Sequence, residues 1–327
     1  MFRLTAVALA GIAGALCLTP VAAAEGRTPG SLLIYPVYDS YPSSGTLISI
    51  TNTKDDPSFN PNTNLNGVVD VHFIYIDGID WSEFNRYERL TPNDNFTVVA
   101  TVHNPNSETG FLYCIALDPT TRKPVAHNWL IGDEIIADGS GNWLYGFDAI
   151  AFKSLAAEGQ PADLDLDDML ELDGTEYEAI PDTLAISSFL GVGPTDADLV
   201  LLSLVGDSDY LTRVDFEVFN DNEVEFSATY EFRCWYIAAL TDIDQVFTDS
   251  FLSTTNIDPR SNGLGQTTGW VRIDGDRAVD VVANAPRIDD PPFLAAFRQS
   301  LSGISTGHLI HESDADNDVP GLLSSLR

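Results

Sequence analysis

The feature that most constrains the fold is a pair of stretches in which apolar and polar side chains alternate with a period of two. Ser31–Asn52 and Leu199–Asn220 align without a gap, and Leu33 matches Leu201 in this alignment. Alternation of this kind places successive side chains on opposite faces of an extended chain. Both stretches are therefore predicted to be equivalent, half-buried strands of antiparallel sheet, produced by an internal duplication.

Two further pairs of short motifs follow in the same order. Leu90–Asp94 and Leu240–Asp244 share the form L-T-x-x-D, and Gly110–Phe111 is matched by Gly269–Trp270. Gly110–Leu117 is a nearly continuous apolar run, which is typical of a strand covered on both faces. Turn signals recur about every ten residues, a spacing that favours a sandwich.

We therefore predict an all-β protein of two tandem antiparallel β-sandwiches with an immunoglobulin-like architecture. The sandwiches are expected at residues 25–150 and 196–300, joined by a short helical and acidic connector at residues 151–195. Within and beside that connector, Phe147–Ala157 has helical spacing, and Pro181–Leu190 starts with proline and is followed by glycine. Residues 301–327 are predicted to be a polar C-terminal tail.

Residues 1–24 have the organisation of a secretory signal peptide. Arg3 precedes an apolar run, Leu4–Leu18, and the small residues Ala22–Ala24 form a cleavage site before Glu25. The apolar run is shorter than the roughly 20 residues that a membrane-spanning helix needs. We expect export to the extracellular space or periplasm.

The charge balance restricts the possible partners. The chain has 49 acidic and 16 basic residues, a formal net charge of −33. This charge disfavours nucleic acid, whose phosphates need clustered lysine and arginine, and it disfavours anionic membrane surfaces. An acidic, solvated coat is the simplest interpretation, and another envelope protein or a glycan remains a candidate partner.

Two acidic clusters are candidate calcium sites, because calcium loops open with carboxylates at alternate positions. The candidate ligands are Asp163, Asp165, Asp167, Asp314, Asp316 and Asp318. Both clusters depart from the EF-hand pattern, since Asp168 and Val319 stand where a glycine makes the turn. The second cluster resembles, over a few residues, the aspartate-rich calcium repeats of secreted adhesive proteins. The alternative is a solvated linker and tail without a metal.

Other chemistry-bearing side chains are sparse. His72, His103 and His127 would form a three-histidine metal site only if the sheet gathered them. A sugar-stacking platform would need exposed tryptophans, and the candidates are Trp81, Trp129, Trp143, Trp235 and Trp270. Cys114 and Cys234 lie in apolar strands and are expected to be buried and unpaired, with an interdomain disulfide as the alternative.

The sequence shows none of the strand–turn–helix context that a G-x-S-x-G nucleophile elbow needs, and it contains no zinc-protease helix motif. We therefore predict a secreted, non-catalytic structural or binding protein of the cell envelope or extracellular space. The alternatives are a calcium-dependent carbohydrate-binding module and a secreted hydrolase with a site at the sandwich rim. Convergence of the histidines would favour the hydrolase, and exposed tryptophans beside carboxylates would favour carbohydrate binding.

Overall fold

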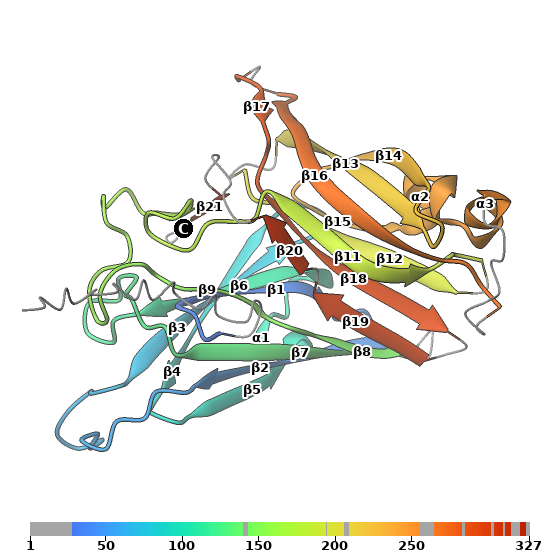
Figure 1. The fold of residues 1–327 in the computed structure, drawn as a ribbon. Coiled ribbons are helices and arrows are strands. Elements are labelled where there is room, and N and C mark those ends of the chain that lie inside the picture. The colour runs from blue at the N-terminus through green and yellow to red at the C-terminus, as the bar shows by residue number, and fades with distance from the viewer. Residues whose placement is uncertain are drawn as a thin grey trace, which may run out of the picture.

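The computed structural model describes residues 28–139, 143–193, 195–205, 209–255, 265–282, 285–301, 304–309, 311–314 and 321–324. The predicted signal peptide lies outside these residues. The fold is all-β, as predicted, and its strands pair antiparallel in several sheets (Figure 1). Helical structure in the described residues is limited to single turns, among them α1 (Ala100–His103), α2 (Leu240–Ile243) and α3 (Asp249–Leu252).

The described residues of the first half of the fold form nine strands in two sheets. They are β1 (Leu32–Asp39), β2 (Ser44–Asn52), β3 (Val69–Asp77), β4 (Glu83–Leu90), β5 (Asn95–Val99), β6 (Thr109–Leu117), β7 (Leu130–Asp138), β8 (Trp143–Asp148) and β9 (Ile150–Phe152). One sheet has the order β4-β3-β6-β1-β9 and the other β5-β2-β7-β8. The predicted strand at Gly110–Leu117 is β6, and it lies in the middle of its sheet.

The second half also contains two large sheets. Its strands are β11 (Thr183–Leu190), β12 (Asp196–Ser203), β13 (Tyr210–Asn220), β14 (Glu225–Phe232), β15 (Trp235–Ala239), β16 (Thr268–Asp280), β17 (Ile288–Asp289), β18 (Phe293–Leu301), β19 (Ile304–Leu309) and β20 (His311–Asp314). One sheet has the order β14-β13-β16-β11-β20, with β17 beside β16, and the other β15-β12-β18-β19. These orders repeat those of the first half strand by strand.

The correspondence extends to an irregularity in one strand pair. In β1 the register with β6 shifts between Tyr35 and Tyr38, so that Tyr38 pairs with Gly110. In β11 the register with β16 shifts between Ile186 and Phe189, and Phe189 pairs with a glycine in the same way. Because a bulge adds a residue to one strand only, its recurrence at the same place aligns the two halves independently of sequence identity.

This alignment corrects the one predicted from sequence. Ser31–Asn52 forms β1 and β2, whereas Leu199–Asn220 forms most of β12 and then β13. The gapless alignment therefore matched each strand with the one after its counterpart, because alternation with a period of two recurs in every half-buried strand. The L-T-x-x-D motifs are also not equivalent, since Leu90 ends β4 and Leu240 begins α2. The glycines of Gly110–Phe111 and Gly269–Trp270 do occupy equivalent positions.

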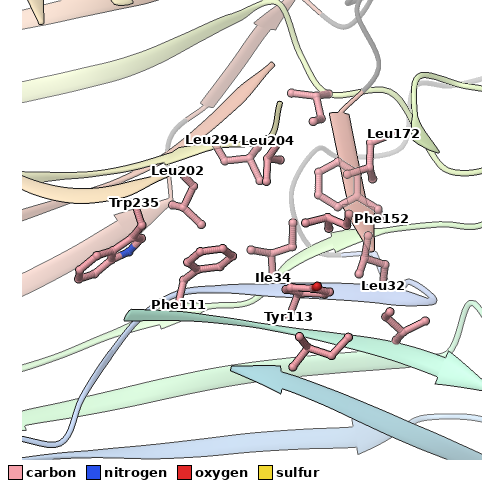
Figure 2. Packing of buried hydrophobic residues seen from close by; sticks show 14 of the residues in the cluster. Leu32, Ile34, Phe111, Tyr113, Phe152, Leu172, Leu202, Leu204, Trp235 and Leu294 are labelled. Carbon is pink, nitrogen blue, oxygen red and sulfur yellow. The ribbon is translucent and has the colours of Figure 1, made fainter. Parts of the chain in front are cut away.

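In the described part of the chain, three hydrophobic cores separate the four large sheets. One core lies inside each half, and the third lies between the five-stranded sheet of the first half and the four-stranded sheet of the second. Figure 2 shows this third core, in which Phe111 from β6 lies beside Trp235 and Leu202 from the second half. The burial of β6 on both faces follows, since one face meets the core of its own half and the other meets this core between the halves.

The predicted helical connector is wrong. Thr183–Leu190 is strand β11, in which Leu184 and Ile186 alternate as strand residues should, and Phe189 is buried after the bulge. The bulge changes the spacing of the apolar residues from two to three, which imitates a helix. Phe147 belongs to β8, and the chain passes directly into the short strand β9.

The predicted polar tail is also wrong. β18 and β19 pair along the edge of a sheet, β20 pairs with β11, and β21 (Gly321–Ser324) pairs with β10 (Met169–Leu172) in a separate two-stranded sheet. β19, β20 and β21 were missed because each is only four to six residues long, and because β20 and β21 pair with strands that are distant in the chain.

Candidate metal centre

Acidic side chains converge in the segment that joins the two halves. We call residues 163–176, which include β10, the acidic loop. Its backbone turns sharply at Leu166 and Asp168, whose φ angles are 65° and 68°. The carboxylate of Asp163 stabilises this turn, because its oxygens accept hydrogen bonds from the backbone N–H groups of Leu166 (2.6 Å) and Asp168 (3.2 Å).

The acidic loop brings five carboxylates into two overlapping groups. Carboxylate oxygens of Asp163, Asp165 and Glu176 lie within 4.8 Å of one another, and so do those of Asp165, Asp167 and Glu171. Asp165 belongs to both groups. Oxygen atoms gathered in this way are the ligands that calcium prefers, since it takes six to eight oxygens at about 2.3–2.6 Å.

Two of these carboxylates are buried. Asp163 is 4% exposed and Glu176 is 1% exposed. Glu176 accepts hydrogen bonds from the backbone N–H groups of Leu164 and Glu171. Among the described residues no lysine or arginine forms an ion pair with Asp163 or Glu176. Buried charge is costly unless an opposite charge compensates it, so this pair of carboxylates favours a bound cation.

Loss of hydration and mutual repulsion both disfavour the charged form of two of these carboxylates. The pKa of Glu171 is raised to about 7, first by loss of hydration and then by the charges of Glu176, Asp165, Asp167 and Asp173. Burial also raises the pKa of Glu176, against the backbone hydrogen bonds that lower it. Both shifts mean that the charged form is disfavoured until a proton or a cation neutralises it.

A buried phenol lies near the same charges. The hydroxyl of Tyr177 is completely buried and has no hydrogen-bond partner among the described residues. Its pKa is raised by burial first, and then by the charges of Glu176 and Asp163. An unsatisfied hydroxyl in such a place is unusual, because buried polar groups are nearly always hydrogen-bonded to protein, water or a ligand.

The first predicted cluster is thus brought together, and Glu176 was missed. Glu176 lies beyond Gly174, the position at which an EF-hand loop would close with its glutamate, so spacing alone gave no signal for it. Of the second cluster, Asp316 and Asp318 lie outside the described residues. Asp314 ends β20, where its backbone pairs with Thr183.

The three histidines have separate environments. The Nε2 atom of His72 is 2.6 Å from Asn85 Oδ1, and the Nδ1 atom of His103 is 2.8 Å from the hydroxyl of Tyr75. His127 Nε2 is 3.0 Å from Asn52 Oδ1. Burial lowers the pKa of both His103 and His127 to about 4. In the part of the chain that the structure describes, no group of potential metal ligands includes a histidine.

The described tryptophan side chains do not form one platform. Trp235 is 6% exposed, and Trp81 packs against the core between the halves. Trp270 of β16 stacks on Phe219 of β13, with ring centroids 4.3 Å apart. Trp129 lies in the first half and is 40% exposed. The Trp143 side chain lies outside the described residues. Cys114 is buried in β6, as expected, whereas Cys234 is only half-buried and lies between β14 and β15, and the two are not joined by a disulfide.

A second polar feature is a cleft of about 220 Å³ on the first half. Asp133 and Asp148 pair across β7 and β8 in its wall, beside Ile131 and Ala149. Loss of hydration, followed by the charge of Asp148, raises the pKa of Asp133. The described lining includes no aromatic ring on which a sugar could stack, so this cleft does not favour carbohydrate binding.

No family model and no curated protein matches this chain. Among solved structures, a chain from the cryo-EM structure of broad bean stain virus is similar at a TM-score of 0.19 and 10% identity, over 89% of this chain and 80% of that chain. A TM-score of 0.19 is too low for any inference about the fold or function of this chain. None of the described helices is long and apolar enough to cross a bilayer.

Proposed function

We propose that this protein is a secreted, non-catalytic structural or binding protein of the cell envelope or extracellular space, and that it binds calcium through the acidic loop. The observation that carries the calcium proposal is the convergence of Asp163, Asp165 and Glu176, whose oxygens lie within 4.8 Å of one another. Calcium fits this donor set better than zinc, because zinc sites are built mainly from cysteine and histidine.

Export is supported by the signal-like residues 1–24 and by the acidic composition. Millimolar calcium in extracellular fluids suits a site of modest affinity, and extracellular modules bind calcium with dissociation constants of about 10⁻⁴–10⁻³ M. The acidic coat disfavours nucleic acid and anionic membranes as partners, and leaves another envelope protein or a glycan. The calcium-dependent carbohydrate alternative has less support, because the described tryptophans do not gather beside the acidic loop.

We further propose that the two halves are tandem copies of one ancestral β-sandwich with an immunoglobulin-like architecture. The identical strand orders and the recurring bulge support this origin. So does a steric constraint at the equivalent glycines. A Cβ at Gly110 would lie 1.9 Å from the carbonyl oxygen of Ile76, and one at Gly269 would lie 2.7 Å from that of Phe219. Ile76 and Phe219 are themselves equivalent by register.

Isothermal titration calorimetry with calcium tests the binding proposal on the full chain in 0.15 M salt. Asp165→Asn is the decisive variant, because Asp165 belongs to both carboxylate groups and is exposed. We expect its calcium affinity to fall at least tenfold. Asp80→Asn is a matched control, since Asp80 is also exposed and also accepts a backbone hydrogen bond from the residue two positions later. Absence of binding, or equal binding by both variants, would contradict the proposal.

A further inference from the structure

The acidic loop is connected to the C-terminal strand through β10. β10 has two faces of different character. Leu170 and Leu172 are buried in the core between the halves. The carboxylate of Glu171, on the other face, lies in one cluster with the carboxylates of Asp165 and Asp167. A change in the position of β10 therefore affects the candidate cation site and this core together.

The segment that follows β10, residues 176–180, turns back along one edge of β10, and we call it the returning chain. β21 lies along the opposite edge. On one edge, the backbone N–H groups of Tyr177 and Ile180 donate to the carbonyls of Glu171 (3.1 Å) and Leu172 (3.1 Å). On the other edge β21 pairs with β10, and Leu323 lies opposite Leu170. Glu176 belongs to the returning chain, so its carboxylate joins that chain to the start of the acidic loop and to β10.

β21 depends on β10 for its place in the fold. Among the described residues, β10 is its single strand partner. Leu323 is 6% exposed and belongs to the core between the halves. Figure 2 shows Leu172 of β10 on the side of this core where Phe152 and Leu32 lie. The C-terminal strand thus covers one side of the contact between the two halves.

We propose that a cation bound in the acidic loop fixes β10 and thereby fastens the C-terminal strand β21 over the core between the halves. This inference rests on the proposed calcium site and assigns that site a regulatory effect. Without the cation, repulsion among Asp165, Asp167 and Glu171 acts directly on β10. With the cation, undocking β21 together with β10 requires release of the cation as well.

Hydrogen–deuterium exchange of the full chain tests this coupling at the backbone amides of residues 321–324. The measurement compares calcium with sodium chloride at matched ionic strength. If undocking requires cation release, exchange slows by up to about 100-fold at a calcium concentration 100 times the dissociation constant. The edge strand β5 is the internal control, because it lies in the outer sheet of the first half, and its exchange should not change.

Two variants keep the test decisive. Asp165→Asn should remove the calcium effect on residues 321–324, while Asp80→Asn should retain it. Leu323→Ala should speed exchange at these residues with or without calcium and leave the calcium affinity within about threefold.

The outcomes separate the two proposals. If calorimetry detects calcium binding at the acidic loop but exchange at residues 321–324 is unchanged, or slows equally in β5, the coupling is overturned and the calcium site stands. If calcium does not bind, the proposed function fails first.

Discussion

Trp235→Ala should destabilise the whole molecule, because this side chain joins the two halves. Trp235 is 6% exposed in the core between the halves, and its Nε1–H donates to the carbonyl oxygen of Pro36 at 2.8 Å. Removing a buried tryptophan side chain costs about 3–5 kcal/mol. The orphaned Pro36 carbonyl adds about 1–3 kcal/mol. We expect a total loss of roughly 4–8 kcal/mol.

Urea unfolding followed by circular dichroism measures this loss without relying on tryptophan fluorescence. Trp235→Phe keeps most of the ring packing and should recover more than half of the lost stability. Trp129→Ala is the control, because Trp129 is 40% exposed, and its loss should be under about 1 kcal/mol. A loss below about 1 kcal/mol for Trp235→Ala, or a shift confined to one of two separate transitions, would refute the idea that this core joins the halves into one cooperative unit.

Two further predictions concern pH and the equivalent glycines. With calcium removed by a chelator, the free energy of unfolding should fall as the pH rises from about 4.5 to about 7. The pKa of Glu171 is about 7 in the folded state, against an ordinary value of 4.5. The folded state therefore binds one more proton than the unfolded state in this range, and that proton is lost as the pH rises. Glu171→Gln should flatten this part of the profile in urea unfolding at several pH values, and an unchanged slope would contradict the assignment to Glu171. Gly110→Ala and Gly269→Ala should each destabilise their sheet, by roughly 1–3 kcal/mol or more. The larger loss is expected at Gly110, because a Cβ there would lie 1.9 Å from a carbonyl oxygen, whereas a Cβ at Gly269 would lie 2.7 Å from one. Thermal melting ranks the two variants, and a neutral effect at either site would contradict the close backbone approach.

The sequence predicted the class of fold because alternation is a local signal. Ile48 and Ile50 are both buried, as expected of the inward positions of β2. Alternation alone does not identify which strand of one half corresponds to which strand of the other. The predicted alignment therefore matched β1 and β2 with β12 and β13, each one strand after its true counterpart. The equivalence of β1 and β11 became visible only through pairing with distant strands, in particular through the bulge before Tyr38.

Part of the candidate site was also predicted from a local signal. Asp163, Asp165 and Asp167 lie close together in the sequence, and their alternate spacing pointed to calcium. Glu176 reaches the cluster only because the chain turns back along β10, which no spacing rule describes. The strand β11 was predicted as a helix because its bulge altered the spacing of Ile186 and Phe189.

The most direct test of the calcium site is a crystal structure of the full chain grown with calcium, with an anomalous difference map to locate the ion. We predict a peak in the acidic loop with oxygens of Asp163, Asp165 and Glu176 at about 2.3–2.6 Å, completed by other oxygens to a coordination of six to eight. An empty acidic loop at calcium concentrations well above 1 mM, the upper end of the range for extracellular modules, or a peak held by other residues, would contradict the account.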